Sequence, residues 1–278
     1  MIFIYDGAFE GFLSAVFDAY SRKTEPLDIV SSLGEMQLIL DADYHYVETT
    51  EEKADRLMAG MDTISDEFSD QVILAFLSWM PGKEMMIYRY IAMGFKIREK
   101  IFSKLDDDTV RKFLDMCRQT GREVQTWKGF LRFSIMDNHA FYAEMSPQNN
   151  VLTLIMPHFT RRMGPKPFLI HDTTYSQMGV YDTREWWVRP SEGLTLPRLH
   201  SDEMKYRYMW KLFYDTTAIE GRANSKQRQQ MMPERYQKHV TELQQQSFQG
   251  DFNKSAAAVI QGTENSTLIT IGEADRNL

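Results

Sequence analysis

Two histidines, two arginines and an aspartate lie within fifteen positions near the middle of the chain: His158, Arg161, Arg162, His171 and Asp172. Guanidinium groups bind phosphate and other anions, and imidazole gains or loses a proton near neutral pH. Asp172 could orient a neighbouring side chain or take a proton from it. The stretch is therefore a candidate anion site, and His158, His171 and Asp172 are candidates for acid/base catalysis.

The same residues also fit a structural role. A histidine and an aspartate at the end of a buried strand are more often held in internal hydrogen bonds than used in catalysis. His158, His171 and Asp172 show none of the spacings of zinc sites, such as HExxH or CxxC, and no glycine-rich phosphate loop is present. The only cysteine, Cys117, is expected to be a buried thiol within a helix. The sequence therefore predicts neither a bound metal nor another cofactor.

More basic and aromatic residues follow towards the C-terminus. Arg235 and Tyr236 are adjacent, and the pair offers a guanidinium group for a phosphate and a ring on which an unpaired base can stack. Trp186 and Trp187 are adjacent on a predicted strand, so we expect one to face the core and the other the surface. Packing is the simpler role for both tryptophans. The candidate DNA-binding residues are Arg161, Arg162, Arg222, Lys226, Arg228, Arg235 and Tyr236.

The composition is that of a protein with a large hydrophobic core. The chain has 278 residues, of which 43% are hydrophobic and 13% aromatic. No apolar run approaches the ~20 residues that cross a bilayer as a helix, and the first residues lack the basic segment of a signal peptide. A single cysteine excludes an internal disulfide. We expect a cytoplasmic protein without a membrane segment.

Charge is distributed unevenly along the chain, whose formal net charge is −7. Residues 1–126 contain 14 Lys and Arg against 23 Asp and Glu, whereas residues 127–243 contain 16 against 12. A basic surface favours nucleic acid, because contacts with phosphate supply most non-specific affinity. The positive excess in the second part is small, so charge alone does not predict a stable complex with bulk DNA.

Hydrophobic periodicity predicts a helix-rich, acidic N-terminal part over residues 1–126. A short apolar strand opens the chain at residues 1–5, and a helix with aromatic residues at helical spacing runs from Phe9 until Pro26 ends it. Further elements are expected as one or two strands within residues 36–48 and as helices at residues 50–65, 66–80, 84–103 and 107–121.

The pattern changes to that of an α+β part with basic C-terminal helices in residues 127–243. Strands are expected at residues 130–135, 141–145, 168–171, 178–181 and 185–189, with a helix at residues 150–162. This ββαββ pattern predicts an antiparallel sheet with a helix on one face, and the fold class is α+β. Helices begin near Asp202 and after Asn224, and Pro233 breaks the second of them. The polar residues 244–278 are predicted to form a disordered tail.

Three blocks of the sequence resemble one bacterial protein family, in matching order and spacing. They are residues 5–17 (YDGAFEGFLSAVF), residues 157–162 (PHFTRR) through 170–172 (IHD), and residues 210–214 (WKLFY) through 232–236 (MPERY). The family is that of bacterial DNA metabolism and DNA repair proteins, and the resemblance spans residues 1–243. It implies a partner, a radical-SAM protein of DNA modification or repair. The same domain of unknown function is also found fused ahead of some uracil-DNA glycosylases.

The chain departs from those fused proteins in one respect. Their glycosylase domain follows the shared module and holds an iron–sulfur cluster through cysteines. This chain has one cysteine, ends in a polar segment and lacks the glycine-rich, acidic loop that activates water in such a glycosylase. The resemblance therefore implies the stand-alone module, not a complete glycosylase.

Three functions remain open from the sequence. The favoured one is a DNA-binding accessory that presents damaged or modified DNA to a radical-SAM partner. The second is an enzyme that acts on a nucleic acid or nucleotide, with His158 or His171 and Asp172 as acid and base. The third is a protein–protein scaffold without DNA contact, in which the acidic residues 1–126 dock the partner.

Overall fold

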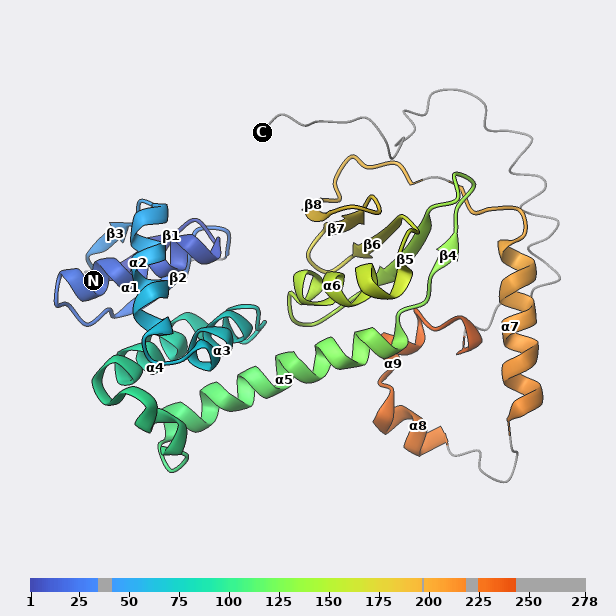
Figure 1. Cartoon of the computed structure of the whole chain (residues 1–278). Coiled ribbons are helices and arrows are strands. Elements are labelled where there is room, and N and C mark those ends of the chain that lie inside the picture. Colours follow the sequence, from blue (N-terminus) through green and yellow to red (C-terminus); the bar gives the residue numbers. More distant parts are fainter. Residues whose placement is uncertain (35–41, 197, 219–224, 244–278) are drawn as a thin grey trace. The chain divides into compact units, whose positions relative to one another are not determined.

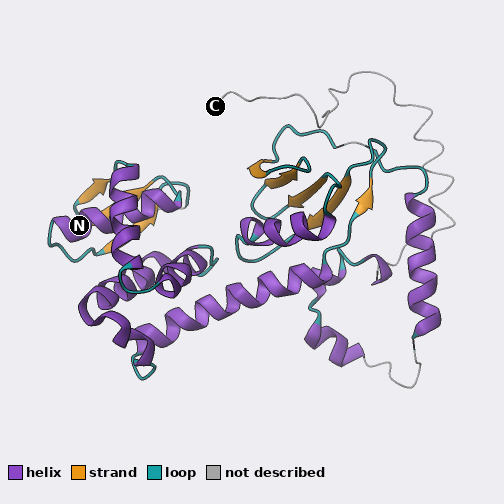
Figure 2. Cartoon of the chain, viewed as in Figure 1, coloured by secondary structure: helices purple, strands orange, loops and turns teal. Residues whose placement is uncertain are grey.

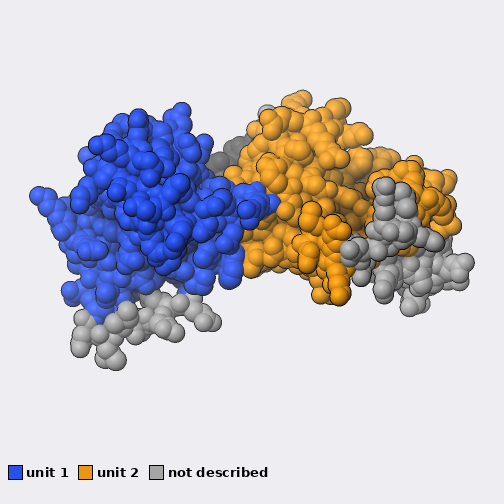
Figure 3. Space-filling model, turned by 90° about the horizontal axis from the view of Figure 1, so that it is seen from below, with its two compact units in different colours: residues 1–122 blue, residues 123–278 orange. Residues whose placement is uncertain are grey.

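The computed structural model describes residues 1–34, 42–196, 198–218 and 225–243. The fold is α+β, as predicted, and its helices and strands are shown in Figure 1. The chain divides into two compact units, residues 1–122 (unit 1) and residues 123–278 (unit 2), which Figure 3 colours separately. The division falls inside the long helix α5, whose residues belong partly to each unit.

Unit 1 contains a parallel sheet of three short strands in the order β2-β1-β3. The strands are β1 (Ile2–Tyr5), β2 (Asp28–Ser31) and β3 (Tyr44–Tyr46). Helix α1 (Phe9–Ser21) connects β1 to β2, and this helical crossover makes the two strands parallel. β1 is buried throughout because it is the central strand. The sequence did not predict β2, and residues 36–41 of the predicted 36–48 strand region lie outside the described residues.

The remaining helices of unit 1 begin where the sequence predicts. They are α2 (Glu51–Asp62), α3 (Asp66–Phe76), α4 (Lys83–Ile97), the 3₁₀ turn η1 (Arg98–Ser103) and α5 (Asp108–Phe130). Thr50 caps α2 by accepting a hydrogen bond from Lys53 N at 3.4 Å, and Ser65 caps α3 by accepting one from Phe68 N at 3.1 Å. Both caps satisfy backbone donors that the first helical turn leaves free.

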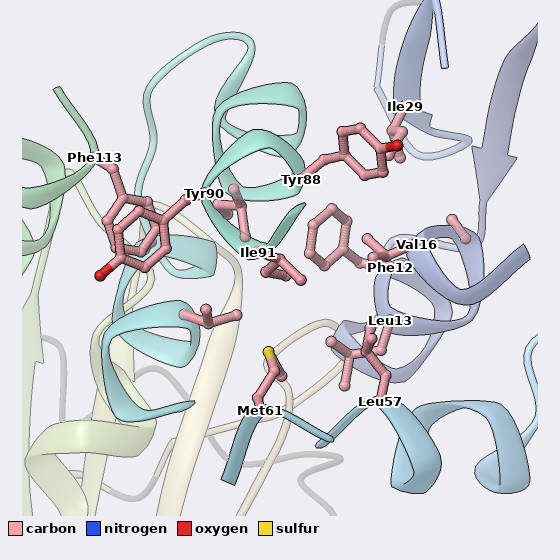
Figure 4. Packing of buried hydrophobic residues seen from close by; sticks show 14 of the residues in the cluster. Phe12, Leu13, Val16, Ile29, Leu57, Met61, Tyr88, Tyr90, Ile91 and Phe113 are labelled. Carbon is pink, nitrogen blue, oxygen red and sulfur yellow. The ribbon is translucent and has the colours of Figure 1, made fainter. Parts of the chain in front are cut away.

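The core of unit 1 is aromatic and continuous. Phe12, Leu13 and Val16 of α1 point towards the side chains of α2 and α4 (Figure 4). Further along, the ring of Tyr90 stacks between Phe68 and Phe113, with centroid distances of 5.0 and 3.6 Å. One continuous core thus extends within unit 1 from the parallel sheet to the first turns of α5.

Helix α5 extends beyond its predicted end. The sequence predicts a helix to residue 121 and a change to strand near residue 130, but α5 continues to Phe130. Trp127 explains the extension, because its side chain is completely buried against Tyr236, at 4.8 Å between ring centroids. Only Ser134–Ile135 of the predicted 130–135 strand is extended, as the short strand β4.

Unit 2 holds a five-stranded sheet in the order β4-β5-β6-β7-β8. The other strands are β5 (Phe141–Met145), β6 (Phe168–Asp172), β7 (Gln177–Tyr181) and β8 (Trp186–Pro190). The sheet is mixed and mostly antiparallel, because β5 and β6 are parallel. Helix α6 (Leu152–Met163) connects them, and such a crossover returns the chain to the same end of the sheet. The predicted purely antiparallel sheet is wrong at this pair.

Helix α6 packs on one face of the sheet. Its buried residues include Ile155, Met156 and Phe159, which share a core with Phe168 and Ile170 of β6. Gly179 of β7 permits the close approach, because a Cβ there would lie 2.5 Å from Met156 Sδ. At the sheet edge, on β8, Trp186 is 37% and Trp187 39% exposed. The sequence predicted that one of the two would face the core, and neither is buried there.

Further helices complete unit 2 (Figure 2). They are α7 (Glu203–Thr217), α8 (Ser225–Met231), α9 (Glu234–Gln237) and the 3₁₀ turn η3 (Thr241–Leu243). Pro233 separates α8 from α9, as predicted. The predicted disordered tail, residues 244–278, lies outside the described residues. Within the described part of the chain, no helix is both long and apolar enough to cross a membrane.

Candidate functional site

Arg161 and Arg162 lie together in the last turn of α6 and are exposed. The negative end of the helix dipole favours basic residues there. Arg161 Nε also donates a hydrogen bond to the carbonyl oxygen of Pro157 at 3.1 Å. Neither arginine, nor Lys128 of α5, forms an ion pair with a carboxylate among the described residues. We call Lys128, Arg161, Arg162 and the adjacent His158 the cationic group.

His158 is placed among these positive charges. Partial burial of its ring lowers its pKa, and the nearby charges of Lys128, Arg162 and Arg161 lower it further. Its Nε2 is shielded from solvent and has no hydrogen-bond partner among the described residues. The imidazole is therefore held neutral next to three cations. An anion bound here would gain from the cations and would favour protonation of His158.

His171 and Asp172 are neighbours on β6, so their side chains leave opposite faces of the sheet. Asp172 lies on the face with Phe168 and Ile170, whereas His171 lies on the face with Leu169. Among the described residues, neither His158 nor His171 hydrogen-bonds to Asp172. The structure therefore does not bring the predicted histidine–aspartate pair together.

Asp172 is completely buried at the carboxyl end of β6. Its Oδ1 accepts hydrogen bonds from Thr174 N at 2.9 Å and Tyr175 N at 3.1 Å, and its Oδ2 has no partner among the described residues. Burial raises the pKa of Asp172 to about 6, and the charge of Glu123 raises it further, against the two backbone hydrogen bonds. The carboxyl group can therefore hold a proton close to neutral pH.

Glu123 is the residue at this site that the sequence did not single out. It is buried on α5, where Oε1 accepts a hydrogen bond from Gln148 N and Oε2 one from Asn149 N, each at 2.8 Å. The side chain of Asn149 donates a further bond to Oε2 at 2.5 Å. Glu123 thus holds the loop between β5 and α6. An acidic residue in the middle of an amphipathic helix gave no sequence signal of this role.

Arg235 and Tyr236 of α9 join the same site. Tyr236 is buried and donates a hydrogen bond to Glu123 Oε1 at 3.4 Å. Arg235 lies 4.0 Å from the same carboxylate oxygen and donates to Gln148 Oε1 at 2.5 Å. Arg235 also lies over the ring of Tyr236, at 4.9 Å from its centroid. We call Glu123, Asp172, Arg235 and Tyr236 the acidic site; in it Tyr236 packs in the core and is not available for stacking on a base.

The other predicted basic residues lie apart from this site or outside the described part. Lys226 is exposed on α8. Arg228 is on the same helix, but its side chain is outside the described part of the structure, and Arg222 falls in the segment that is not described. The predicted DNA-binding residues therefore divide between the cationic group, the acidic site and α8.

Residues 81–242 match the family described as DUF4130, a domain of unknown function. This match covers more than half of the chain. The chain belongs to the DUF4130 family. The chain matches none of the curated proteins with which it was compared. The DUF4130 segment includes all of the cationic group and all of the acidic site.

The DUF4130 segment also contains a series of polar side chains, joined by hydrogen bonds and one ion-pair contact, that sequence reasoning missed. His171 Nδ1 lies 3.0 Å from the hydroxyl of Tyr142, which donates to Glu144 Oε2 at 3.5 Å. The other oxygen of Glu144 lies 3.6 Å from His239 Nδ1, and His239 Nε2 lies 2.8 Å from Ser146 Oγ. Of these, only His171 was predicted to be functional. The one sequence feature that could have indicated Ser146 is its position directly after a predicted strand.

Proposed function

We propose that this DUF4130 protein binds DNA through the cationic group and works as an accessory in DNA metabolism or repair. The observation that carries the proposal is that the charges of Lys128, Arg161 and Arg162 all act on His158, and that none of the three has a carboxylate partner among the described residues. Like charges held together are unfavourable unless an anion neutralises them. Guanidinium groups match the phosphate diester, to which they can donate two parallel hydrogen bonds.

The contrast with other basic residues supports this choice. Arg111 and Lys112 both pair with Asp108, and Arg132 pairs with Glu242 at 2.8 Å. Cations that already pair with a carboxylate add little binding free energy for a new anion, because binding would first break the existing ion pair. Among the described residues, the cationic group has no ion pair with a carboxylate that binding would have to break. Arg161 and Arg162 are also exposed and therefore accessible to a polymer.

A protein partner is part of the proposal. The resemblance of the sequence to DNA repair proteins suggests a radical-SAM protein, to which this chain would present DNA. Helix α7 offers a surface for a protein, because Tyr206, Met209 and Phe213 are each more than 40% exposed on one side of the helix. Exposed apolar patches of this kind are typical of interaction sites. Removal of their side chains should weaken capture of the partner without changing DNA affinity.

Fluorescence anisotropy with short single-stranded and duplex DNA tests the DNA proposal. The variant Arg161→Ala/Arg162→Ala should lose at least tenfold in affinity. The matched control is Arg111→Ala/Lys112→Ala, which removes the same charge from two side chains that both pair with Asp108. Equal losses in both variants, or no binding by the native protein at low salt, would reject the proposal.

A second candidate function is catalysis, and Asp172 favours it. A buried carboxyl with a pKa of about 6 and an unpaired oxygen is suited to exchange a proton near neutral pH. Asp172→Asn would then abolish turnover of a nucleotide or nucleic acid while preserving the fold. Turnover equal to that of the native protein would exclude Asp172 as the acid or base.

A further inference from the structure

Ser146 and Glu144 lie at the two ring nitrogens of His239, the serine within hydrogen-bond distance and the carboxylate within ion-pair distance. Ser146 Oγ is 2.8 Å from His239 Nε2, and Glu144 Oε1 is 3.6 Å from His239 Nδ1. The two contacts use opposite nitrogens of one imidazole. In serine hydrolases the same arrangement lets the acid hold the ring while the free nitrogen takes the hydroxyl proton.

The fold brings these residues together at a place suited to a site. Glu144 is on β5, and Ser146 follows the carboxyl end of that strand. β5, α6 and β6 form a parallel crossover unit, and ligands of such units bind at the carboxyl ends of the strands. His239 comes from more than 90 positions later in the sequence, just after α9. A serine and a histidine so distant in sequence meet only because the C-terminal segment packs at this edge.

The protonation state of His239 fits a base. Its side chain is only 5% exposed. Burial lowers its pKa, Glu144 raises it and Lys238 lowers it again, so the net shift is downward. A neutral imidazole can accept the proton of Ser146, and Glu144 beside Nδ1 favours the tautomer with the proton on Nδ1. The Ser146 hydroxyl then donates to Nε2.

We propose that Ser146 is a nucleophile for acyl transfer, with His239 as its base and Glu144 as the positioning residue, acting on a neutral carboxylic ester. Ser146 Oγ bonds to the acyl carbon while its proton moves to His239 Nε2. The bond from the acyl carbon to the alcohol oxygen breaks, and the alcohol leaves with that proton. Water then hydrolyses the acyl serine by the same route and releases the acid.

A neutral ester suits the site better than a phosphate diester. The exposed Glu144 carboxylate lies next to the reacting atoms and would repel an anionic substrate. The cationic group, by contrast, is on α6 and α5, where no residue of this serine site lies. The acyl-transfer proposal is therefore independent of DNA binding, and either can fail without the other.

A fluorophosphonate reagent tests the serine directly, because it forms a bond to an activated serine oxygen and expels fluoride. The full chain is treated with the reagent, and the labelled residue is identified by mass spectrometry. We expect label on Ser146, at least a tenfold decrease in His239→Gln, and no change in Ser103→Ala. Absence of label on Ser146, or equal label in His239→Gln, would overturn the proposal and leave a structural hydrogen bond.

A second variant covers the case in which His239→Gln does not fold, as judged by circular dichroism. Ser146→Cys replaces the hydroxyl by a thiol that His239 should activate. The native Cys117 does not interfere, because burial raises its pKa to about 12. We expect iodoacetamide to alkylate Ser146→Cys at least tenfold faster at pH 7 than it alkylates Ser103→Cys, whose side chain is exposed. Equal rates would overturn the proposal.

Discussion

The cationic group and the acidic site are both in unit 2, but they differ in whether their charged side chains have partners within the protein. The cationic group leaves its two arginines exposed, and its positive charges have no carboxylate partners among the described residues. The acidic site buries the carboxylates of Glu123 and Asp172 and surrounds Glu123 with hydrogen-bond donors. The first arrangement favours a ligand from outside, whereas the second stabilises the loop and the C-terminal helix that it joins.

The difference also separates residues that look alike in the sequence. Arg161 and Arg235 are both arginines near aromatic residues, and both were predicted to bind DNA. Arg235 lies over Tyr236 and close to Glu123, so its charge already serves the fold. In the described part of the chain, Arg161 pairs with no carboxylate and lies over no aromatic ring. A binding surface for an anion therefore depends on cations that have no carboxylate partner within the protein, and a sequence does not reveal which cations these are.

The largest expected effect comes from Glu123→Ala. Removal of the carboxylate takes away the acceptor of the hydrogen bonds that Gln148, Asn149 and Tyr236 donate to Glu123. We expect the free energy of unfolding of unit 2 to fall by about 3 kcal/mol. Urea denaturation followed by tryptophan fluorescence measures it, since four of the five tryptophans lie in residues 123–243.

The control for this prediction is Gln125→Ala, an exposed position on the same helix, which should change stability little. If Glu123→Ala is destabilised by no more than Gln125→Ala, then Glu123 does not hold the acidic site together.

Asp172→Asn is expected to change the free energy of unfolding by a similar amount but in the opposite direction, and this stabilisation depends on pH. The folded pKa of about 6 is above the ordinary value of 3.8, so the folded protein binds more protons than the unfolded chain between these values. The native protein therefore loses stability as pH rises from about 4 to 6 and stays at the lower level above that range. Asn cannot ionise, so its advantage over the native protein should grow to at most about 3 kcal/mol at pH 8.

Chemical denaturation of both proteins at pH 4.5, 6 and 8 checks this prediction. A difference in unfolding free energy that does not vary with pH would show that Asp172 does not titrate in this range. The outcome also bears on catalysis, because an acid or base must exchange its proton near the working pH.

The smallest expected effect is on the pKa of His158. Burial lowers this pKa first, and the cations add to the shift, so Arg161→Ala/Arg162→Ala should raise the pKa of His158. NMR titration of the imidazole measures the change, with His158→Gln to assign the signal. Lys226→Ala, which removes a distant cation from α8, should leave it unchanged. A pKa that stays the same in the double variant would mean that the arginines do not converge on His158.

Sequence patterns predicted the elements well where amphipathicity was strong. The starts of α2 and α3 were predicted to within one residue, and in the structure the side chains of Thr50 and Ser65 cap them. The β5–α6–β6 unit was predicted as three elements, but its parallel pairing was not. Strand direction depends on which end of the sheet the chain returns to, and local hydrophobicity does not report this.

The candidate sites were predictable only as separate residues. Arg161 and Arg162 could be found because they are adjacent in the sequence and follow an apolar helix face. The pairing of Glu123 with Tyr236 joins residues more than 100 positions apart, and the contact of Ser146 with His239 joins residues more than 90 apart. No periodicity or spacing records such contacts, because they arise when the C-terminal segment packs on the sheet and α5.

The salt dependence of DNA binding tests the central claim most directly. The logarithm of the dissociation constant for a single-stranded oligonucleotide is measured against the logarithm of the salt concentration, for the native protein and for Arg161→Ala/Arg162→Ala. Removing one arginine that neutralises a phosphate of single-stranded DNA should reduce the slope by about 0.7. The account predicts a reduction of about 1.4 in the double variant, and a slope identical to that of the native protein would contradict it.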